Sequence, residues 1–89
     1  MSKQKKSGGS TNSVRRELER LDRDLVKLLS DRARAAQRLA KARQADHLPP
    51  YDALEEQETI RRAAELNKGP LSEDSLRIIM RDVLGSLLR

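Results

Sequence analysis

Apolar residues recur at steps of three and four along residues 14–39, with charged residues between them. The recurring positions are Val14, Leu18, Leu21, Leu25, Leu28, then Ala35 or Ala36, and Leu39. This spacing is typical of one face of an amphipathic helix, and no glycine or proline interrupts it before Pro49. The pattern therefore predicts one helix of about thirty residues, about 45 Å long at 1.5 Å per residue.

Two shorter helices are predicted after the segment HLPP, which ends the long one. Asp52 is the expected N-cap of the second helix, with Glu55 in the capping-box position, and this helix runs to about Asn67. The segment NKGP is a stop signal, and Ser72 is the expected N-cap of the third helix. The apolar stripe of that helix consists of Leu76, Ile79, Met80, Val83 and Leu87.

The fold class that follows is all-α, with one long helix and two shorter ones per subunit. Residues 1–12 are polar and lysine-bearing, and they predict a disordered basic leader ahead of one helical domain at residues 13–89. The two shorter helices reach only part of the long apolar stripe. We therefore expect a homodimer in which a second copy covers the rest, and one arrangement that does so places the long helices side by side.

Composition narrows the function classes further. The chain has 89 residues, no cysteine and a single aromatic residue, Tyr51, so disulfides, zinc clusters of cysteine and thiol chemistry are excluded. No apolar run approaches the roughly 20 residues of a membrane span, and the N-terminus lacks the apolar stretch of a secretory signal. We expect a cytoplasmic protein with no membrane partner.

The net charge of +5 is concentrated in the leader, where Lys3, Lys5 and Lys6 lie. Those three lysines leave 16 of the 19 basic residues against 14 acidic residues from Val14 onward. The domain is therefore nearly balanced, and it lacks the interleaved aromatic residues on which single-stranded nucleic acids stack. No nucleic-acid partner is expected.

The segment DRARAAQRLAKAR, residues 31–43, carries cations where the apolar stripe continues. Arg32 and Arg43 fall on the stripe, three turns and about 16 Å apart, with alanines between them that leave room for a small anion. Buried arginines need carboxylate partners, from the protein or from a ligand, and the planar guanidinium suits them. Two other arrangements fit the pattern: the arginines bend outward to solvent, or they pair with acids of the second helix such as Asp52 and Glu56.

From Val14 nearly to its end the chain resembles the all-helical class of chorismate mutases. The resemblance rests on VRRELERLDRDLVKLLSDRARAAQRLAKAR as the first helix, on PPYDALEEQETI as the loop and second-helix start, and on NKGPLSEDSLRIIMRDVLGS as the third-helix entry. It implies an intertwined homodimer of three-helix subunits that converts chorismate to prephenate for phenylalanine and tyrosine, without a cofactor. The reaction is an intramolecular Claisen rearrangement, which needs neither nucleophile nor general base and is favoured by cations around the dianionic substrate.

The resemblance also assigns roles to residues of the predicted site. Arg32 resembles the arginine that grips a substrate carboxylate within its own subunit, and Arg15 resembles the one contributed by the partner subunit. Arg43 stands where the family commonly has a lysine that contacts a carboxylate and the ether oxygen. Asp52 and Glu56 resemble the acidic pair that meets the substrate hydroxyl. From the pattern by itself, Arg15 reads as an exposed cation and Asp52 as a helix cap.

Three departures from the family pattern predict a weak enzyme, or one that depends on an activating partner enzyme, as some short members do. Glu55 stands where an arginine is usual, Leu87 lies near the position of a small hydroxyl residue, and the sequence ends at Arg89 before a glutamine that some members use. Losing one donor to the ether oxygen costs on the order of 3 kcal/mol, or about a hundredfold in rate.

Three other functions fit the same residues. A noncatalytic or partner-activated regulatory dimer is favoured by Glu55 and Leu87. An isochorismate pyruvate lyase would use the same scaffold, although the Tyr-Asp pair after the prolines resembles the mutase pattern more closely. A protein-binding helical bundle is opposed by the two arginines on the apolar stripe.

Overall fold

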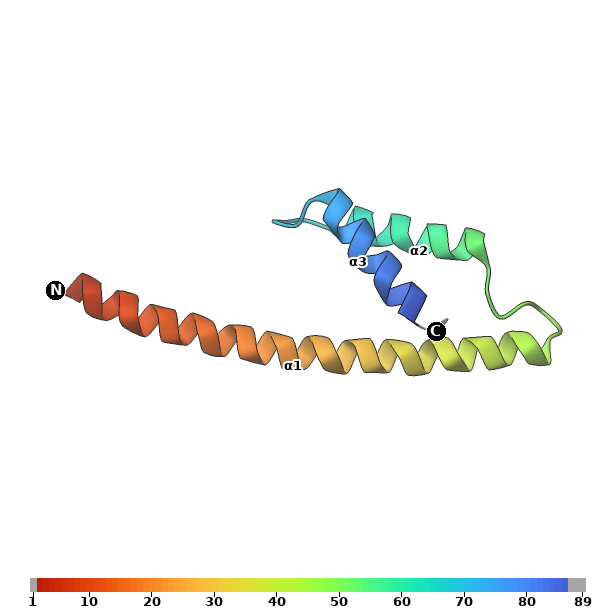
Figure 1. Cartoon of the computed structure of the whole chain (residues 1–89), viewed down its shortest axis with the longest axis horizontal. Coiled ribbons are helices and arrows are strands. Elements are labelled where there is room, and N and C mark those ends of the chain that lie inside the picture. Colours follow the sequence, from red (N-terminus) through yellow and green to blue (C-terminus); the bar gives the residue numbers. More distant parts are fainter. Residues whose placement is uncertain (1, 87–89) are drawn as a thin grey trace. The chain divides into compact units, whose positions relative to one another are not determined.

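A computed structural model describes the backbone of residues 2–86 and the side chains of residues 10–86, and it contains three helices and no strand over that range (Figure 1). They are α1 (Ser2–Ala45), α2 (Ala53–Leu66) and α3 (Glu73–Gly85). The all-α class and the order of one long and two shorter helices are confirmed. The chain divides into two units, residues 1–32 and residues 33–89.

Helix α1 begins earlier than the sequence predicts. Its first residue is Ser2, so it includes most of the predicted leader, whereas order was expected from about Ser13. Residues 2–12 contain no proline, so the helical hydrogen-bonding pattern of α1 meets no obligatory break there. The division into a leader at 1–12 and a domain at 13–89 stays a prediction.

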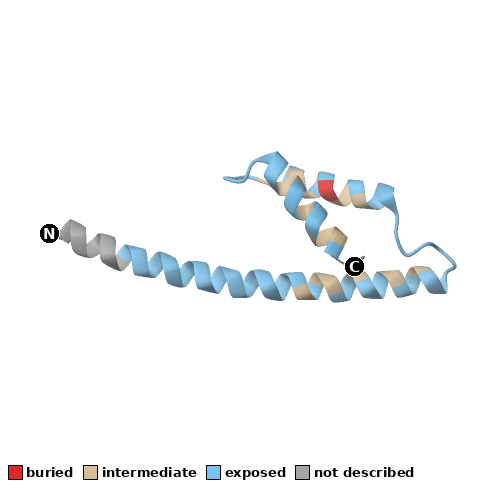
Figure 2. Ribbon diagram, viewed as in Figure 1, coloured by how far each residue is buried: buried red, intermediate tan, exposed pale blue. Residues whose placement is uncertain are grey.

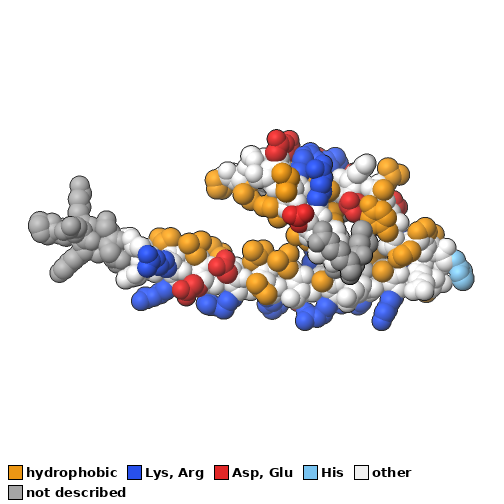
Figure 3. All heavy atoms as spheres, in the orientation of Figure 1, with side chains coloured by type: hydrophobic (Ala, Val, Ile, Leu, Met, Phe, Trp, Pro, Cys, Tyr) orange, Lys and Arg blue, Asp and Glu red, His pale blue; other side chains and the backbone are white. Residues whose placement is uncertain are grey.

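The first unit exposes its predicted apolar stripe. Val14 is 51% exposed, Leu18 54%, Leu21 46% and Leu25 55% in the single chain. Figure 3 shows hydrophobic side chains along one edge of this helix and basic side chains mainly along the other. The helix is therefore amphipathic as predicted, and no other element of the first unit packs against its apolar face.

In the second unit, α2 packs against α3. Ile60 of α2 is the buried hydrophobic residue of the described side chains, with 6% of its surface exposed, and Figure 2 marks it in red. Met80, on the predicted apolar stripe of the third helix, is half-buried on α3. Leu87, the last residue of the predicted stripe, lies outside the described residues. The core of this unit is small, which agrees with the shortage of large apolar and aromatic side chains in the sequence.

Both shorter helices have the N-caps that the sequence predicts. Asp52 Oδ1 accepts hydrogen bonds from the backbone N–H groups of Leu54, at 2.9 Å, and Glu55, at 3.3 Å. Ser72 Oγ accepts from the N–H of Ser75 at 3.0 Å. Each cap satisfies backbone donors that have no partner within the first helical turn, which fixes where the helix starts.

The C-terminus of α1 is closed by a Schellman motif. The N–H of Leu48 donates to the carbonyl of Arg43 at 2.8 Å, and the N–H of His47 donates to the carbonyl of Gln44 at 3.0 Å. His47 occupies the left-handed position with φ 60°, where glycine is usual. It lies exposed in a turn. The motif turns the chain away from α1 just before Pro49.

A membrane-spanning helix requires a minimum length and a high hydropathy over that length. No helical segment within residues 2–86 is at once long enough and apolar enough to span a bilayer.

Candidate active site

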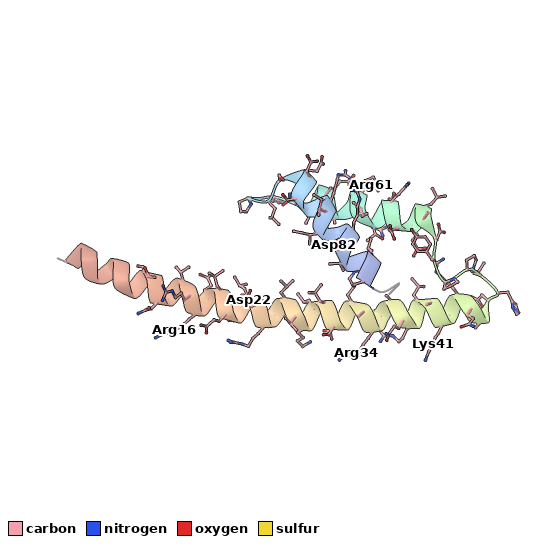
Figure 4. All side chains as sticks on the ribbon, viewed as in Figure 1. Arg16, Asp22, Arg34, Lys41, Arg61 and Asp82 are labelled. Carbon is pink, nitrogen blue, oxygen red and sulfur yellow. The ribbon has the colours of Figure 1, made fainter. Side chains whose placement is uncertain are left out.

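The cations of residues 31–43 separate into two groups by burial. Arg32 and Arg43 are half-buried, as their places on the apolar stripe predict. The other cations of this segment are exposed: Arg34, Arg38 and Lys41. Figure 4 shows Arg34 and Lys41 projecting from the same edge of α1. Placement on the stripe therefore distinguishes the two candidate site residues from their neighbours.

Arg43 is held by a carboxylate on the next helix. Its Nη2 donates to Oε2 of Glu55, and the arginine side chain is 15% exposed while that of Glu55 is 46% exposed. One alternative from the sequence was a pairing of Arg43 with acids of the second helix such as Asp52 and Glu56, and Glu55 was assigned to the capping box. In the structure Glu55 is the partner instead, because the turn after α1 brings the first turn of α2 to Arg43.

Asp52 and Glu56 lie one helical turn apart at the start of α2. The Asp52 carboxylate caps the helix through Oδ1, and the N–H of Glu56 donates to the Asp52 carbonyl at 3.0 Å. Asp52 is exposed and Glu56 is half-buried. Both acids predicted for the site therefore lie at the same helix start as Glu55, and a helix N-terminus favours their negative charge.

Tyr51 lies next to these acids in the sequence, and its phenol is affected by their charges. Partial desolvation raises the pKa of its phenol, and the Glu56 carboxylate raises it further through its charge and a side-chain hydrogen bond. The charge of Asp52 acts in the same direction. The sequence carries only the adjacency of Tyr51 to the capping Asp52, and that adjacency does not show that the phenol lies toward Glu56.

Arg15 and Arg32 belong to the first unit, whereas Arg43, Asp52 and Glu56 belong to the second. Arg15 is exposed in the single chain, as its pattern suggests. Within the second unit the structure brings Arg43 to Glu55 and gathers Asp52 with Glu56. Of the predicted departures from the family pattern, Leu87 and Arg89 lie outside the described residues.

A second charged cluster on α2 is separate from Arg43. Arg61, labelled in Figure 4, forms ion pairs with Glu58 and Glu65 along the same helix. These contacts raise the pKa of Arg61, and the hydrogen bond with Arg61 lowers the pKa of Glu58. All three are partly or largely exposed, so this network resembles ordinary helix-surface pairs.

The described residues define an all-helical protein whose candidate site consists of fixed charges. In the second unit, half-buried Arg43 and the acidic start of α2 are fixed charges, of the kind that orient a small anion and stabilise charge that develops on it.

Comparison with known proteins identifies the family. The chain matches the family described as chorismate mutase type II over residues 14–89, and it belongs to that family. The match begins one residue after the predicted domain start.

Two solved structures and one curated relative that are similar to this chain are also named as chorismate mutases. Chorismate mutase from Thermus thermophilus, form I, is 26% identical with a TM-score of 0.82, and the match covers 85% of this chain and 95% of that chain. Form II is 27% identical with a TM-score of 0.82, covering 86% and 88%. The bifunctional chorismate mutase/prephenate dehydratase of Aquifex aeolicus (strain VF5) is 28% identical over 79 residues, or 84% of this chain. The match spans only 22% of that relative's length.

Proposed function

We propose that this protein rearranges chorismate to prephenate in a cationic site. The observation that carries the proposal is the match to chorismate mutase type II over residues 14–89, which includes each of the five candidate site residues. The two half-buried arginines of α1 support it independently, because the apolar stripe has no structural need for cations there.

The rearrangement requires electrostatic stabilisation by the protein, and the protein forms no covalent bond with the substrate. Chorismate carries two carboxylates, and its ether oxygen gains negative charge as the C–O bond breaks. Guanidinium groups fixed beforehand bind the carboxylates in a reactive geometry and favour the charge on that oxygen more in the transition state than in the substrate. The Claisen rearrangement is intramolecular, so no group is transferred to the protein.

The roles follow the charges of the side chains. Arg32 binds one substrate carboxylate, and Arg43 donates to the other carboxylate and to the ether oxygen. Arg15 comes from the partner subunit. Asp52 and Glu56 form the acidic pair that meets the substrate hydroxyl, and one of the two carboxylates accepts its hydrogen bond.

A homodimer completes the site in this proposal. The exposed apolar stripe of the first unit supports it, since Val14, Leu18, Leu21 and Leu25 are each about half exposed in the single chain. A contiguous apolar face of this kind is typical of an interface with another protein, and closed two-fold symmetry is the commonest arrangement of such a pair. A cytoplasmic location and an activating partner enzyme stay predictions.

Arg32→Ala tests the proposed function. We expect wild-type protein to convert chorismate to prephenate and the variant to lose at least about a hundredfold in kcat/KM, because one substrate carboxylate loses its partner. Arg38→Ala is the matched control, since Arg38 is an exposed cation on the same helix. Equal turnover by wild type and Arg32→Ala would contradict the assigned site. No turnover by a folded wild-type dimer would instead favour a regulatory or partner-activated role.

Mixed dimers test the shared site. Arg15→Ala and Arg32→Ala subunits are each expected to be inactive, whereas a hybrid contains one site with both arginines and recovers part of the activity. Absence of recovery in isolated heterodimers would contradict the assignment of Arg15 to the partner's site.

A further inference from the structure

Glu55 is the acid that contacts Arg43, and the proposed reaction leaves it without a role. The Glu55 carboxylate accepts from Nη2 of Arg43 on the preceding helix. The arginine is 15% exposed and the glutamate 46% exposed, so one charge is largely withdrawn from water and the other stays in contact with it. An ion pair of this kind is oriented more firmly than a pair on an open helix surface.

The backbone of each partner is fixed by local hydrogen bonds. The carbonyl of Arg43 accepts from the N–H groups of Asp46, at 3.0 Å, and Leu48, at 2.8 Å, in the closing turn of α1. The N–H of Glu55 donates to the capping carboxylate of Asp52 at 3.3 Å. Both side chains therefore extend from anchored positions, and their contact restricts the rotamers of a long, otherwise mobile arginine.

The contact engages one side of the guanidinium. Glu55 uses Nη2, and in the part of the chain whose side chains are described the structure gives Arg43 no other side-chain acceptor. A guanidinium has five N–H donors in a planar fork, so the donors of Nε and Nη1 stay available for a ligand anion. The glutamate thus fixes the plane of the fork without covering all of it.

We propose that Glu55 is a positioning residue for Arg43, an inference that rests on the proposed function. Glu55 holds the guanidinium in the orientation that the reaction requires and thereby raises kcat. Its negative charge also opposes the binding of a dianionic substrate, so the same residue raises KM. The departure from the family's usual arginine at this position then has a function, because Arg43 gains an orienting partner from it.

The two effects of Glu55 separate in steady-state kinetics. In Glu55→Gln the repulsion disappears and the charge-assisted bond weakens, so we expect KM to fall about threefold and kcat to fall about tenfold. In Glu55→Asp the charge stays but the side chain is shorter by one methylene group, so we expect kcat to fall while KM is not lowered. A purely structural role would change stability without this split.

Glu65→Gln is the matched control. Glu65 also lies on α2 and pairs with an arginine, Arg61, but it does not contact Arg43. We expect this variant to keep the wild-type kcat and KM. Circular dichroism of each variant checks that the helices are intact, and Glu55→Asp serves as the second variant if Glu55→Gln unfolds.

A double-mutant cycle distinguishes failure of this inference from failure of the proposed function. In an Arg43→Ala background, Glu55→Gln is expected to lower kcat no further, because the group that it orients is absent. If Arg43→Ala impairs turnover but Glu55→Gln leaves kcat unchanged, the positioning role is wrong and the proposed function stands. If the wild-type chain has no mutase activity, both proposals fall together.

Discussion

Replacing His47 by glycine is expected to stabilise the protein. His47 lies at the left-handed position that closes α1, with φ 60°, and its side chain is exposed. Its N–H donates to the carbonyl of Gln44 at 3.0 Å, and these backbone bonds do not depend on the imidazole. Glycine can therefore keep the motif and remove the steric conflict of the Cβ atom.

The magnitude is a difference between two opposing terms. An L-residue in the left-handed region is destabilised by about 1–2 kcal/mol, whereas glycine loses about 0.5–1 kcal/mol more backbone entropy on folding than alanine does. Taking the lower values together and the higher values together leaves a net stabilisation of about 0.5–1 kcal/mol. In a domain of 60–100 residues, at about 4–8 °C per kcal/mol, this corresponds to a rise in Tm of about 2–8 °C.

Thermal unfolding followed by circular dichroism measures this difference. All variants are compared at the same protomer concentration, because the stability of the proposed dimer depends on that concentration. His47→Ala is the control: it removes the imidazole but keeps the Cβ atom, and its Tm is expected to stay close to that of wild type. A Tm for His47→Gly no higher than that of His47→Ala would refute the reasoning, since backbone strain at this position would then contribute nothing.

Two further predictions concern the start of α2. Because Tyr51 is the only tyrosine, an ultraviolet absorbance titration reports its phenol alone. We expect the pKa of Tyr51 to lie above its usual value of about 10 in wild type and to move back toward that value in Glu56→Gln. An unshifted pKa in wild type would contradict the contact with Glu56. The folded protein holds the phenolic proton of Tyr51 more tightly than the unfolded chain does. The contribution of this proton to the free energy of unfolding is therefore fully present below the pKa of the unfolded chain and is lost as the pH rises through the pKa of the folded protein. Asp52→Ala should lower the free energy of unfolding by about 1 kcal/mol by removing the cap, whereas Asp52→Asn keeps the cap and changes it little. If urea unfolding gives both variants the same loss, the contribution of Asp52 is its charge rather than its hydrogen bonds.

The helices were largely predictable because their signals are local. Asp52 and Ser72 cap α2 and α3 as predicted, since a side-chain oxygen that reaches the next free N–H groups needs only a few residues of sequence. The start of α1 was not predictable in the same way. A polar stretch without proline carries no stop signal, and the helix begins at Ser2 instead of near Ser13.

The sequence predicted which cations of the candidate site are half-buried, but it did not predict which side chains they contact. Arg32 and Arg43 were distinguished by their places on the apolar stripe, and both are half-buried. An acid of the second helix was among the partners considered for Arg43, but Glu55 in particular was not predicted, because spacing along α2 does not tell which of three neighbouring acids faces another helix. The role of Tyr51 beside Glu56 was missed for the same reason.

The sequence by itself determined the number of helices, their caps and the face of α1 on which two arginines interrupt the apolar residues. Those properties follow from the periodicity of the helix and from bonds between near neighbours. Only the tertiary structure decided that Glu55 holds Arg43 and that Tyr51 joins the acidic cluster. Such contacts depend on the turn at residues 46–52, whose backbone angles, including the left-handed one at His47, set the direction in which α2 leaves α1.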